Sequence, residues 1–200
     1  MNKIAFGAAL AALSLAMPGA ALAQRAPAAT IVVVDSDRIY RDCNACRAAQ
    51  TQLQSQVNAA QQRAQALGQP IQTEGQSIEQ AARAAANQQG AARTAAETAL
   101  QQRITALQTR QNTANQELQR LEQNIQSSRA NVLRQINARL NPIISQVMNA
   151  RGANLAVDTN ATLAHAPALE VTAEVLAALN QQLPSVSVTP LPQQQQPTGR

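Results

Sequence analysis

The chain has 200 residues, and 16 Lys and Arg against 11 Asp and Glu give it a formal net charge of +5. It contains no Trp, one Tyr and one Phe. Aromatic side chains normally fill much of a large core, so this composition disfavours a large single-chain core and favours helical oligomerisation.

The first 23 residues are typical of a secretory signal peptide. Lys3 provides the positive start, residues 4–17 form an apolar run, and Ala21-Leu22-Ala23 fits the small-x-small cleavage rule. The apolar run is too short for a spanning helix, and an uncleaved anchor is the less favoured alternative. We therefore expect cleavage after Ala23 and a mature chain outside the cytoplasm.

Residues 24–42 are expected to begin a small β body. The β-branched run at residues 30–34 (TIVVV) predicts a short buried strand. Ser36 or Asp37 would then cap a helix that starts near Arg38.

Residues 43–150 predict a long antiparallel helical hairpin with its tip near residues 87–92. Apolar or small residues recur at alternating steps of three and four in both halves, which is the spacing of a coiled-coil seam. The turn signal between the halves is Asn87-Gln88-Gln89-Gly90. The expected seam positions are Gln50, Leu53, Val57, Ala60, Ala64, Leu67, Ile71, Glu74, Ile78, Ala81 and Ala85, then Leu100, Ile104, Leu107, Gln111, Ala114, Leu118, Leu121, Ile125, Ser128 and Val132.

This seam is thin, because many positions are Ala and four are polar, namely Gln50, Glu74, Gln111 and Ser128. Apolar burial is worth about 25 cal/mol per Å², so we expect slender, flexible arms. The register stays in phase across Gly68-Gln69-Pro70, which predicts a kink rather than a break. At about 1.5 Å per residue, arms of roughly 40 residues reach on the order of 60 Å.

Residues 151–183 are expected to complete the body. The preceding residues 132–148 have a denser apolar face than the seam, so this part of the helix should pack on the body. Within the body, residues 154–158 and 161–164 predict two further short strands.

The end of the chain divides into a helix and a tail. Residues 171–183 predict an amphipathic helix capped by Thr172. Residues 184–200 are rich in Pro and Gln, which is typical of a disordered tail.

The order of these segments resembles the Skp/OmpH family of periplasmic chaperones. The resemblance rests on IVVVDSDRIY, the Ala- and Gln-rich hairpin, NLAVDTNATLA and EVTAEVLAAL, and residues 154–179 are its most specific part. It implies a mainly α fold with a small β body, assembled as a jellyfish-shaped homotrimer. It also implies a periplasmic, ATP-independent holdase without cofactors, whose clients are unfolded outer-membrane β-barrel proteins. The chain departs from the family in its Lys-free arms, its tail, Gly68 with Pro70, and Cys43 with Cys46.

Cys43 and Cys46 stand at the start of the first long helix. A C-x-x-C motif between a strand and a helix is how a thioredoxin-like site begins, but a redox enzyme needs more strands than this chain predicts. Haem attachment would need His where Arg47 stands, and two thiolates make a poor zinc site. In an oxidising compartment a local disulfide, or a pair of structural cysteines, is favoured.

No signal for an enzyme is present, and we predict neither a catalytic nor a metal site. Asp35, Asp37, Asp42 and Asp158 lie beside expected strand ends and caps, where acidic residues serve the backbone. His165 is the only His. There is no Ser/His/Asp arrangement, no phosphate-binding glycine loop and no basic cluster with interleaved aromatics. Dispersed arginines on an exported chain also disfavour nucleic-acid binding.

The arm arginines are the candidate client-binding residues. Between Arg47 and Arg151, 11 Arg and five Glu give the hairpin a net charge of +6. Arg is weakly hydrated and pairs with carboxylates in a planar fork, although for any one residue a solvated helix face is the alternative. Contact with an anionic membrane surface, and a role as a structural coiled-coil spacer or adaptor of the envelope, stay open. The candidates are Arg63, Arg83, Arg93, Arg103, Arg110 and Arg120.

Overall fold

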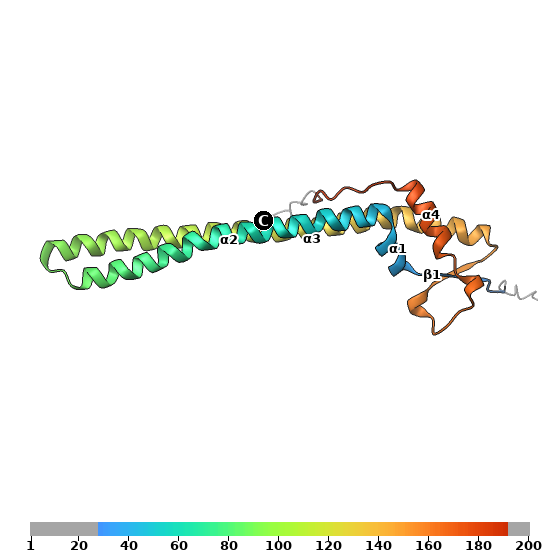
Figure 1. Ribbon diagram of the computed structural model, residues 1–200, viewed down its shortest axis with the longest axis horizontal. Coiled ribbons are helices and arrows are strands. Elements are labelled where there is room, and N and C mark those ends of the chain that lie inside the picture. The colour runs from blue at the N-terminus through green and yellow to red at the C-terminus, as the bar shows by residue number, and fades with distance from the viewer. Residues whose placement is uncertain (1–27, 192–200) are drawn as a thin grey trace, which may run out of the picture.

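The computed structural model describes residues 28–191 and shows a mainly helical chain with a small two-stranded sheet. The signal peptide predicted at residues 1–23 lies outside the described residues, as do residues 192–200. Figure 1 shows a long pair of helices that projects from a small body at one end.

The sheet of the body consists of β1 (Ile31–Val34) and β2 (Leu155–Asp158). The strands are parallel, and the register pairs Ile31 with Leu155 and Val34 with Asp158. β1 is buried at its last three positions, as the β-branched run predicted. One further bridge joins Val33 to Glu170.

The third strand predicted at residues 161–164 is wrong. Residues Thr159–Ala161 form a turn of 3-10 helix, and no strand follows before α4 within the described residues. Asp158 explains the difference, because its Oδ1 accepts a hydrogen bond from the Asn160 backbone N–H at 2.8 Å and turns the chain. The Asn160 side chain donates to Asp37 Oδ2 at 3.0 Å, which holds the turn against the helix that follows β1.

The cap of α1 (Ser36–Asp42) is Asp35 rather than the predicted Ser36 or Asp37. Asp35 keeps an extended backbone directly after β1, and its Oδ1 accepts from the Arg38 backbone N–H at 2.8 Å. Ser36 instead donates its hydroxyl to Asp158. Asp35, Ser36 and Asp37 could each cap a helix. Asp158, the last residue of β2, engages Ser36, and Asp35 is the cap.

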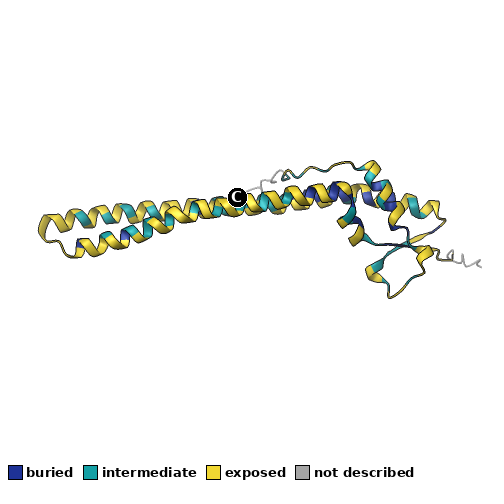
Figure 2. Cartoon of the chain, viewed as in Figure 1, coloured by how far each residue is buried: buried dark blue, intermediate teal, exposed yellow. Residues whose placement is uncertain are grey.

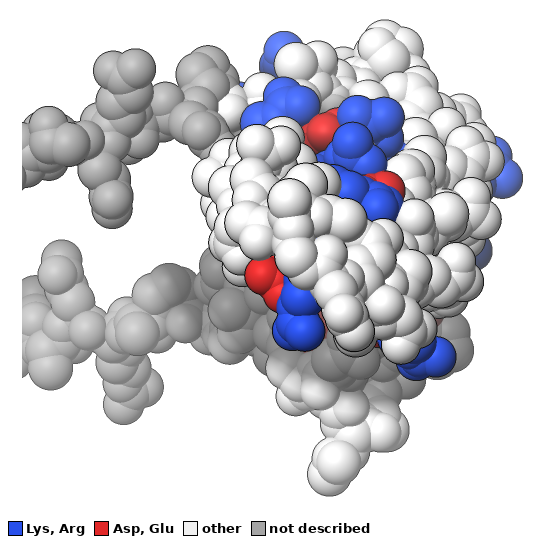
Figure 3. Space-filling view, turned by 90° about the vertical axis from the view of Figure 1, so that its left-hand side faces the viewer, with Lys and Arg blue, Asp and Glu red and all other residues white. Residues whose placement is uncertain are grey.

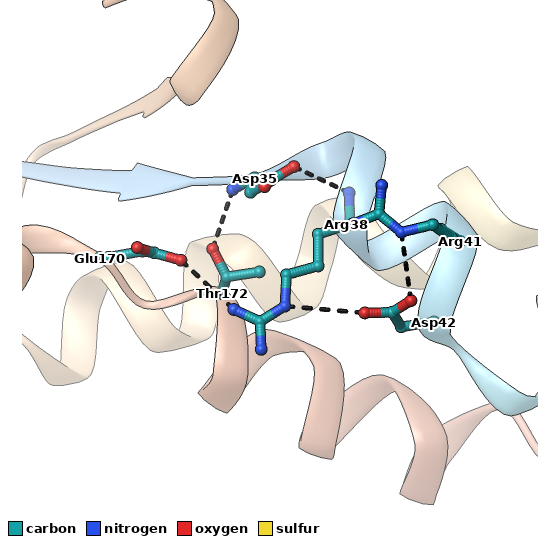
Figure 4. A network of polar contacts seen from close by, with 6 residues as sticks. All are labelled: Asp35, Arg38, Arg41, Asp42, Glu170 and Thr172. Atoms are coloured by element: carbon teal, nitrogen blue, oxygen red, sulfur yellow. Dashed lines mark hydrogen bonds and ion pairs between the residues drawn. The ribbon is translucent and has the colours of Figure 1, made fainter. Parts of the chain in front are cut away.

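Thr172 is the first residue of α4 (Thr172–Gln182) and not its predicted cap, a place taken by Val171 without a side-chain hydrogen bond. The Thr172 hydroxyl is buried and accepts from the Asp35 backbone N–H at 2.9 Å. Figure 4 shows this bond within a network in which Arg38 also contacts Asp42 and Glu170, each at 3.7 Å. The network connects the start of α4 to the junction of β1 and α1.

The two long helices are α2 (Asn44–Ala86) and α3 (Gly90–Ala150), joined by residues 87–89. Gly90 has φ of +61°, a conformation that favours glycine, at the point where the chain reverses. α2 continues through Gly68 and Pro70, so the helix is unbroken there. The kink at this place stays a prediction.

The seam predicted between the helices agrees with the burial pattern at all but three positions. Gln50, Ile104 and Gln111 are exposed, whereas every other predicted seam residue is partly or fully buried. Figure 2 shows partly buried residues scattered among exposed ones along the arms, with buried residues concentrated at the root. Small side chains at the seam account for this incomplete burial.

The core lies where the root of the arms meets the body. The dense face predicted within residues 132–148 is confirmed, because it packs on β1, α1 and α4. The core residues that are at most 2 % exposed include Ile39, Ala49, Ile136, Leu140, Ile143, Val175 and Leu179.

Cys43 and Cys46 form a disulfide at the junction of α1 and α2. Cys43 is also the N-cap of α2, and its sulfur accepts from the Cys46 backbone N–H at 3.0 Å. Both side chains are buried in the core. The disulfide therefore lies where the body turns into the first arm.

The chain after α4 differs from the disordered tail predicted at residues 184–200. Residues 184–191, which we call the C-terminal strap, lie extended along the root of the arms (Figure 1, dark red). Val186 and Val188 pack against the core, and side chains of α2 and α3 hydrogen-bond to the strap. Composition alone did not predict this order, because the partners of the strap lie more than 50 residues away in sequence.

Candidate functional site

The candidate site is the surface of the two arms, α2 and α3. Most of their residues are exposed, and the seam between them is only half-buried over most of its length. In an end-on view from the tip, arginine side chains appear on several sides of the molecule among few acidic ones (Figure 3). The arms thus combine small apolar side chains with a dispersed positive charge.

Two of the six candidate arginines join one arm to the other. Arg63 Nε lies 2.7 Å from Glu117 Oε1, and its Nη2 donates to Oε2 at 3.1 Å, which makes a bidentate pair. Arg103 Nε donates to Glu74 Oε1 at 2.9 Å, and its Nη2 donates to Ser77 Oγ at 2.8 Å. Both arginines therefore link α2 to α3 across the seam.

The ion pairs change the acidity of the glutamates. The hydrogen bond from Arg103 lowers the pKa of Glu74 below its ordinary 4.5, and the hydrogen bond from Arg63 does the same for the pKa of Glu117. The same contact with Glu117 raises the pKa of Arg63. Both glutamates are therefore ionised at neutral pH.

The other four candidates lie differently. Arg93 pairs with Glu97 one helical turn away, at 2.8 Å and on an exposed surface. Within residues 28–191, Arg83, Arg110 and Arg120 have no ion pair, so their charges are available to a partner. The six arginines do not form one cluster. Arg63 and Arg103 join the arms, whereas Arg93 pairs within α3.

A hollow between the arms lies beside the end of the strap, and sequence reasoning missed it. It has a volume of about 440 Å³, and the Arg63–Glu117 pair lies at its border. Its remaining lining comes from both arms and the strap, namely Gln56, Ala59, Ala60, Leu121, Asn124, Ile125 and Pro190. The alternation Ser-Val-Ser-Val-Thr at residues 185–189 was the one sequence signal that pointed to a segment packed here.

The residues considered for chemistry serve structural roles. Asp35 caps α1 and Asp158 caps the 3-10 turn at Thr159–Ala161. The hydrogen bond from the Ser36 hydroxyl is the main cause that lowers the pKa of Asp158. His165 lies 3.5 Å from Glu170 in the body. Among residues 28–191 no group of three or more His, Cys, Asp or Glu is placed to hold a metal ion.

The described part of the chain has no helix long and apolar enough to cross a membrane.

Comparison with known proteins places the chain in a family. A family model described as outer membrane protein (OmpH-like) matches residues 30–179. The fold is similar to a solved structure of an OmpH-like protein from Caulobacter crescentus CB15, itself proposed to be an outer membrane chaperone. That likeness has a TM-score of 0.67 at 19% identity and covers 83% of this chain and 92% of the other. A comparison with curated proteins found no match. Because the family model spans most of the chain, this protein belongs to the OmpH-like family, as its sequence pattern predicted.

Proposed function

We propose that this protein is an ATP-independent periplasmic holdase chaperone that binds unfolded outer-membrane β-barrel proteins between its arms and prevents their aggregation. Membership of the OmpH-like family supports a chaperone role. The activity is binding, so it needs neither a cofactor nor a catalytic residue.

The observation that carries this proposal is the surface of the arms. An unfolded barrel protein exposes alternating apolar side chains and also carries acidic groups. The half-buried Ala and Leu positions of the arms suit the first, and Arg83, Arg110 and Arg120 suit the second. Each contact is weak, but arms that share one body act at a high effective concentration.

We further propose that the antiparallel hairpins of three subunits enclose the client in a jellyfish-shaped trimer. Exposed apolar residues in the body support self-assembly, since Ile31 and Leu155 are 37% and 45% exposed and stand side by side in the sheet. Leu133 on α3 is 51% exposed near the root. Apolar side chains gathered in this way on a small body commonly mark an interface. The number three comes from the family resemblance.

Aggregation of an unfolded client is the direct test. A barrel protein in urea is diluted into buffer with or without the mature chain, and light scattering is followed over time. A holdase suppresses scattering in proportion to the amount of chaperone, without ATP. A structural spacer of the envelope would leave the scattering unchanged, and that result would refute the proposal.

The assembly has its own test. Multi-angle light scattering on the mature chain at micromolar concentration should give about three subunit masses, the number implied by the resemblance. A stable monomer would contradict the proposed trimer but would leave client binding to be judged by the aggregation assay.

A further inference from the structure

The C-terminal strap is bound in a regular way to one face of α3. Gln135 Nε2 donates to Ser187 O at 2.9 Å, Asn131 Nδ2 donates to Thr189 O at 2.9 Å, and Ser127 Oγ accepts from Leu191 N at 2.8 Å. The helix contributes every fourth residue, and the strap is held at every second residue. All three bonds reach backbone atoms of the strap.

The regularity has a geometric cause. Four residues of α-helix rise about 6 Å. Two residues of extended chain rise about 6.6 Å. The two periods match closely over the two steps between these three contacts, so Gln135, Asn131 and Ser127 form a ladder for an extended backbone. Gln56 of α2 adds a bond to Val188 O at 3.2 Å from the other side.

The side chains of the strap complete the pattern. Val186 and Val188 are partly buried against the core, whereas Ser185, Ser187 and Thr189 are exposed. The ladder binds backbone atoms, and the surface beside it accepts every second side chain. Such a site recognises an extended segment with alternating apolar side chains and does not require one particular sequence. This is the pattern of a transmembrane β-strand.

Apolar side chains of both arms line the hollow beside the end of the strap. The 440 Å³ hollow borders Pro190 and continues toward the tip, between Ala60 of α2 and Ile125 of α3. An extended segment longer than the strap would therefore find further apolar surface in line with the ladder. The strap also lies beyond residues 30–179, the part matched by the family model.

We propose that the ladder and its groove form a binding site for one extended segment of an unfolded barrel protein, and that the C-terminal strap is a built-in competitor for it. This inference rests on the proposed holdase function and names the place where a client strand binds. A client must displace the strap, so the strap lowers the affinity for clients that match the groove poorly. Its removal exposes the full site.

The test uses full-length variants. Val186→Asp with Val188→Asp places charges against the core and releases the strap, whereas Gln182→Asp with Ser185→Asp, the control variant, adds the same charge at exposed positions beside the strap. The probe is a fluorescent peptide with the sequence of residues 184–191, together with a labelled, urea-unfolded barrel protein. If the strap fills the groove at least nine-tenths of the time, its release should tighten binding of both probes about tenfold or more. The control variant should bind like the unaltered chain.

Equal or weaker binding of the peptide by the valine variant, with its helical content intact, would overturn the inference. A variant at the ladder, Gln135→Ala in the valine background, should weaken peptide binding, and Gln126→Ala on an exposed part of α3 should not. If the valine variant does not fold, excess free peptide is added to the unaltered chain with bound client. Displacement of the client supports the shared groove, and no displacement refutes it.

The outcomes separate this inference from the proposed function. The valine variant could bind the peptide while neither it nor the unaltered chain binds barrel protein. That result would support the groove as a peptide site and refute the holdase proposal. If the unaltered chain holds barrel protein and the strap variants change nothing, the holdase proposal stands and the competitor is refuted.

Discussion

The exposed arginines of the arms make the sharpest prediction about clients. Replacing Arg83, Arg110 and Arg120 with Gln halves the net charge of the hairpin from +6 to +3. None of the three has an ion pair within the described residues, and the charges of Arg110 and Arg120 act on Glu74 and Glu117 less strongly than the bonded Arg103 and Arg63 do. The change should therefore leave the α2–α3 seam largely intact. We therefore expect weaker client binding with no loss of helical content.

The magnitude follows from the exposure of these side chains. A charge contact at an exposed site is worth roughly 0.2–1 kcal/mol, so three contacts contribute roughly 0.6–3 kcal/mol. The dissociation constant should then rise between about threefold and about 150-fold. Salt should reveal the same contribution, because the screening length falls from about 30 Å at 0.01 M to about 8 Å at 0.15 M. The unaltered chain should lose affinity over this range, and the variant should lose much less.

The assay is a fluorescence titration of a labelled, urea-unfolded barrel protein at low and physiological salt. The matched control replaces Arg47, Arg129 and Arg139 with Gln, which removes the same charge from exposed residues near the root that also lack an ion pair within the described residues. If both variants weaken binding equally, only net charge matters and the arms are not the site. If the arm variant keeps the affinity and salt response of the unaltered chain, the electrostatic part of the mechanism is refuted.

Three further predictions concern stability and the disulfide. The contribution of Glu74 and Glu117 to arm pairing is complete above their ordinary pKa of 4.5 and is lost as the pH falls through their lowered values, so thermal melts from about pH 6 to about pH 3 should show progressive loosening of the arms. Ile143→Ala removes a side chain that is 1% exposed and should cost about 2–5 kcal/mol of unfolding free energy in urea titrations. Cys43→Ser with Cys46→Ser should leave suppression of client aggregation largely intact, because the disulfide lies at the α1–α2 junction in the body.

Each of these has a control. Glu74→Gln with Glu117→Gln should flatten the acid response of the arms, and an unchanged response would assign it to other carboxyls such as Asp158. Leu133→Ala, at a side chain that is 51% exposed in the single chain, should cost far less than Ile143→Ala in a subunit that is kept dissociated. Loss of client holding in the cysteine variant with its oligomer preserved would show that the motif takes part in binding.

Sequence periodicity was sufficient for the long elements of the fold. Steps of three and four repeat over many turns, so one misleading residue such as Gln111 does not hide the seam. The β1 strand was equally clear, because five β-branched residues in succession, Thr30 to Val34, favour a buried strand. The dense face around Ile136 and Leu140 stood out from the Ala-lined seam and placed the core correctly.

The details that failed were decided by contacts between distant segments. Thr172 has the right chemistry for a cap, but Asp35 lies beside it in space and uses its hydroxyl. The pairing of Arg63 with Glu117 depends on the register between two helices, which neither helix specifies alone. The strap was missed for the same reason, since side chains of α3 bond to its backbone groups.

The parallel pairing of β1 with β2 sets the order in which the chain can fold. Ile31 pairs with Leu155, so both arms must be synthesised before the sheet can form. Closing a flexible loop of this length costs roughly 4 kcal/mol by the (3/2)RT ln n estimate. Helix pairing from the loop at residues 87–89 brings the two strands together stepwise and avoids most of that cost. Pairing of the arms thus precedes and promotes formation of the sheet in the body. A variant that prevents the chain reversal near Gly90 should leave β1 without its partner β2.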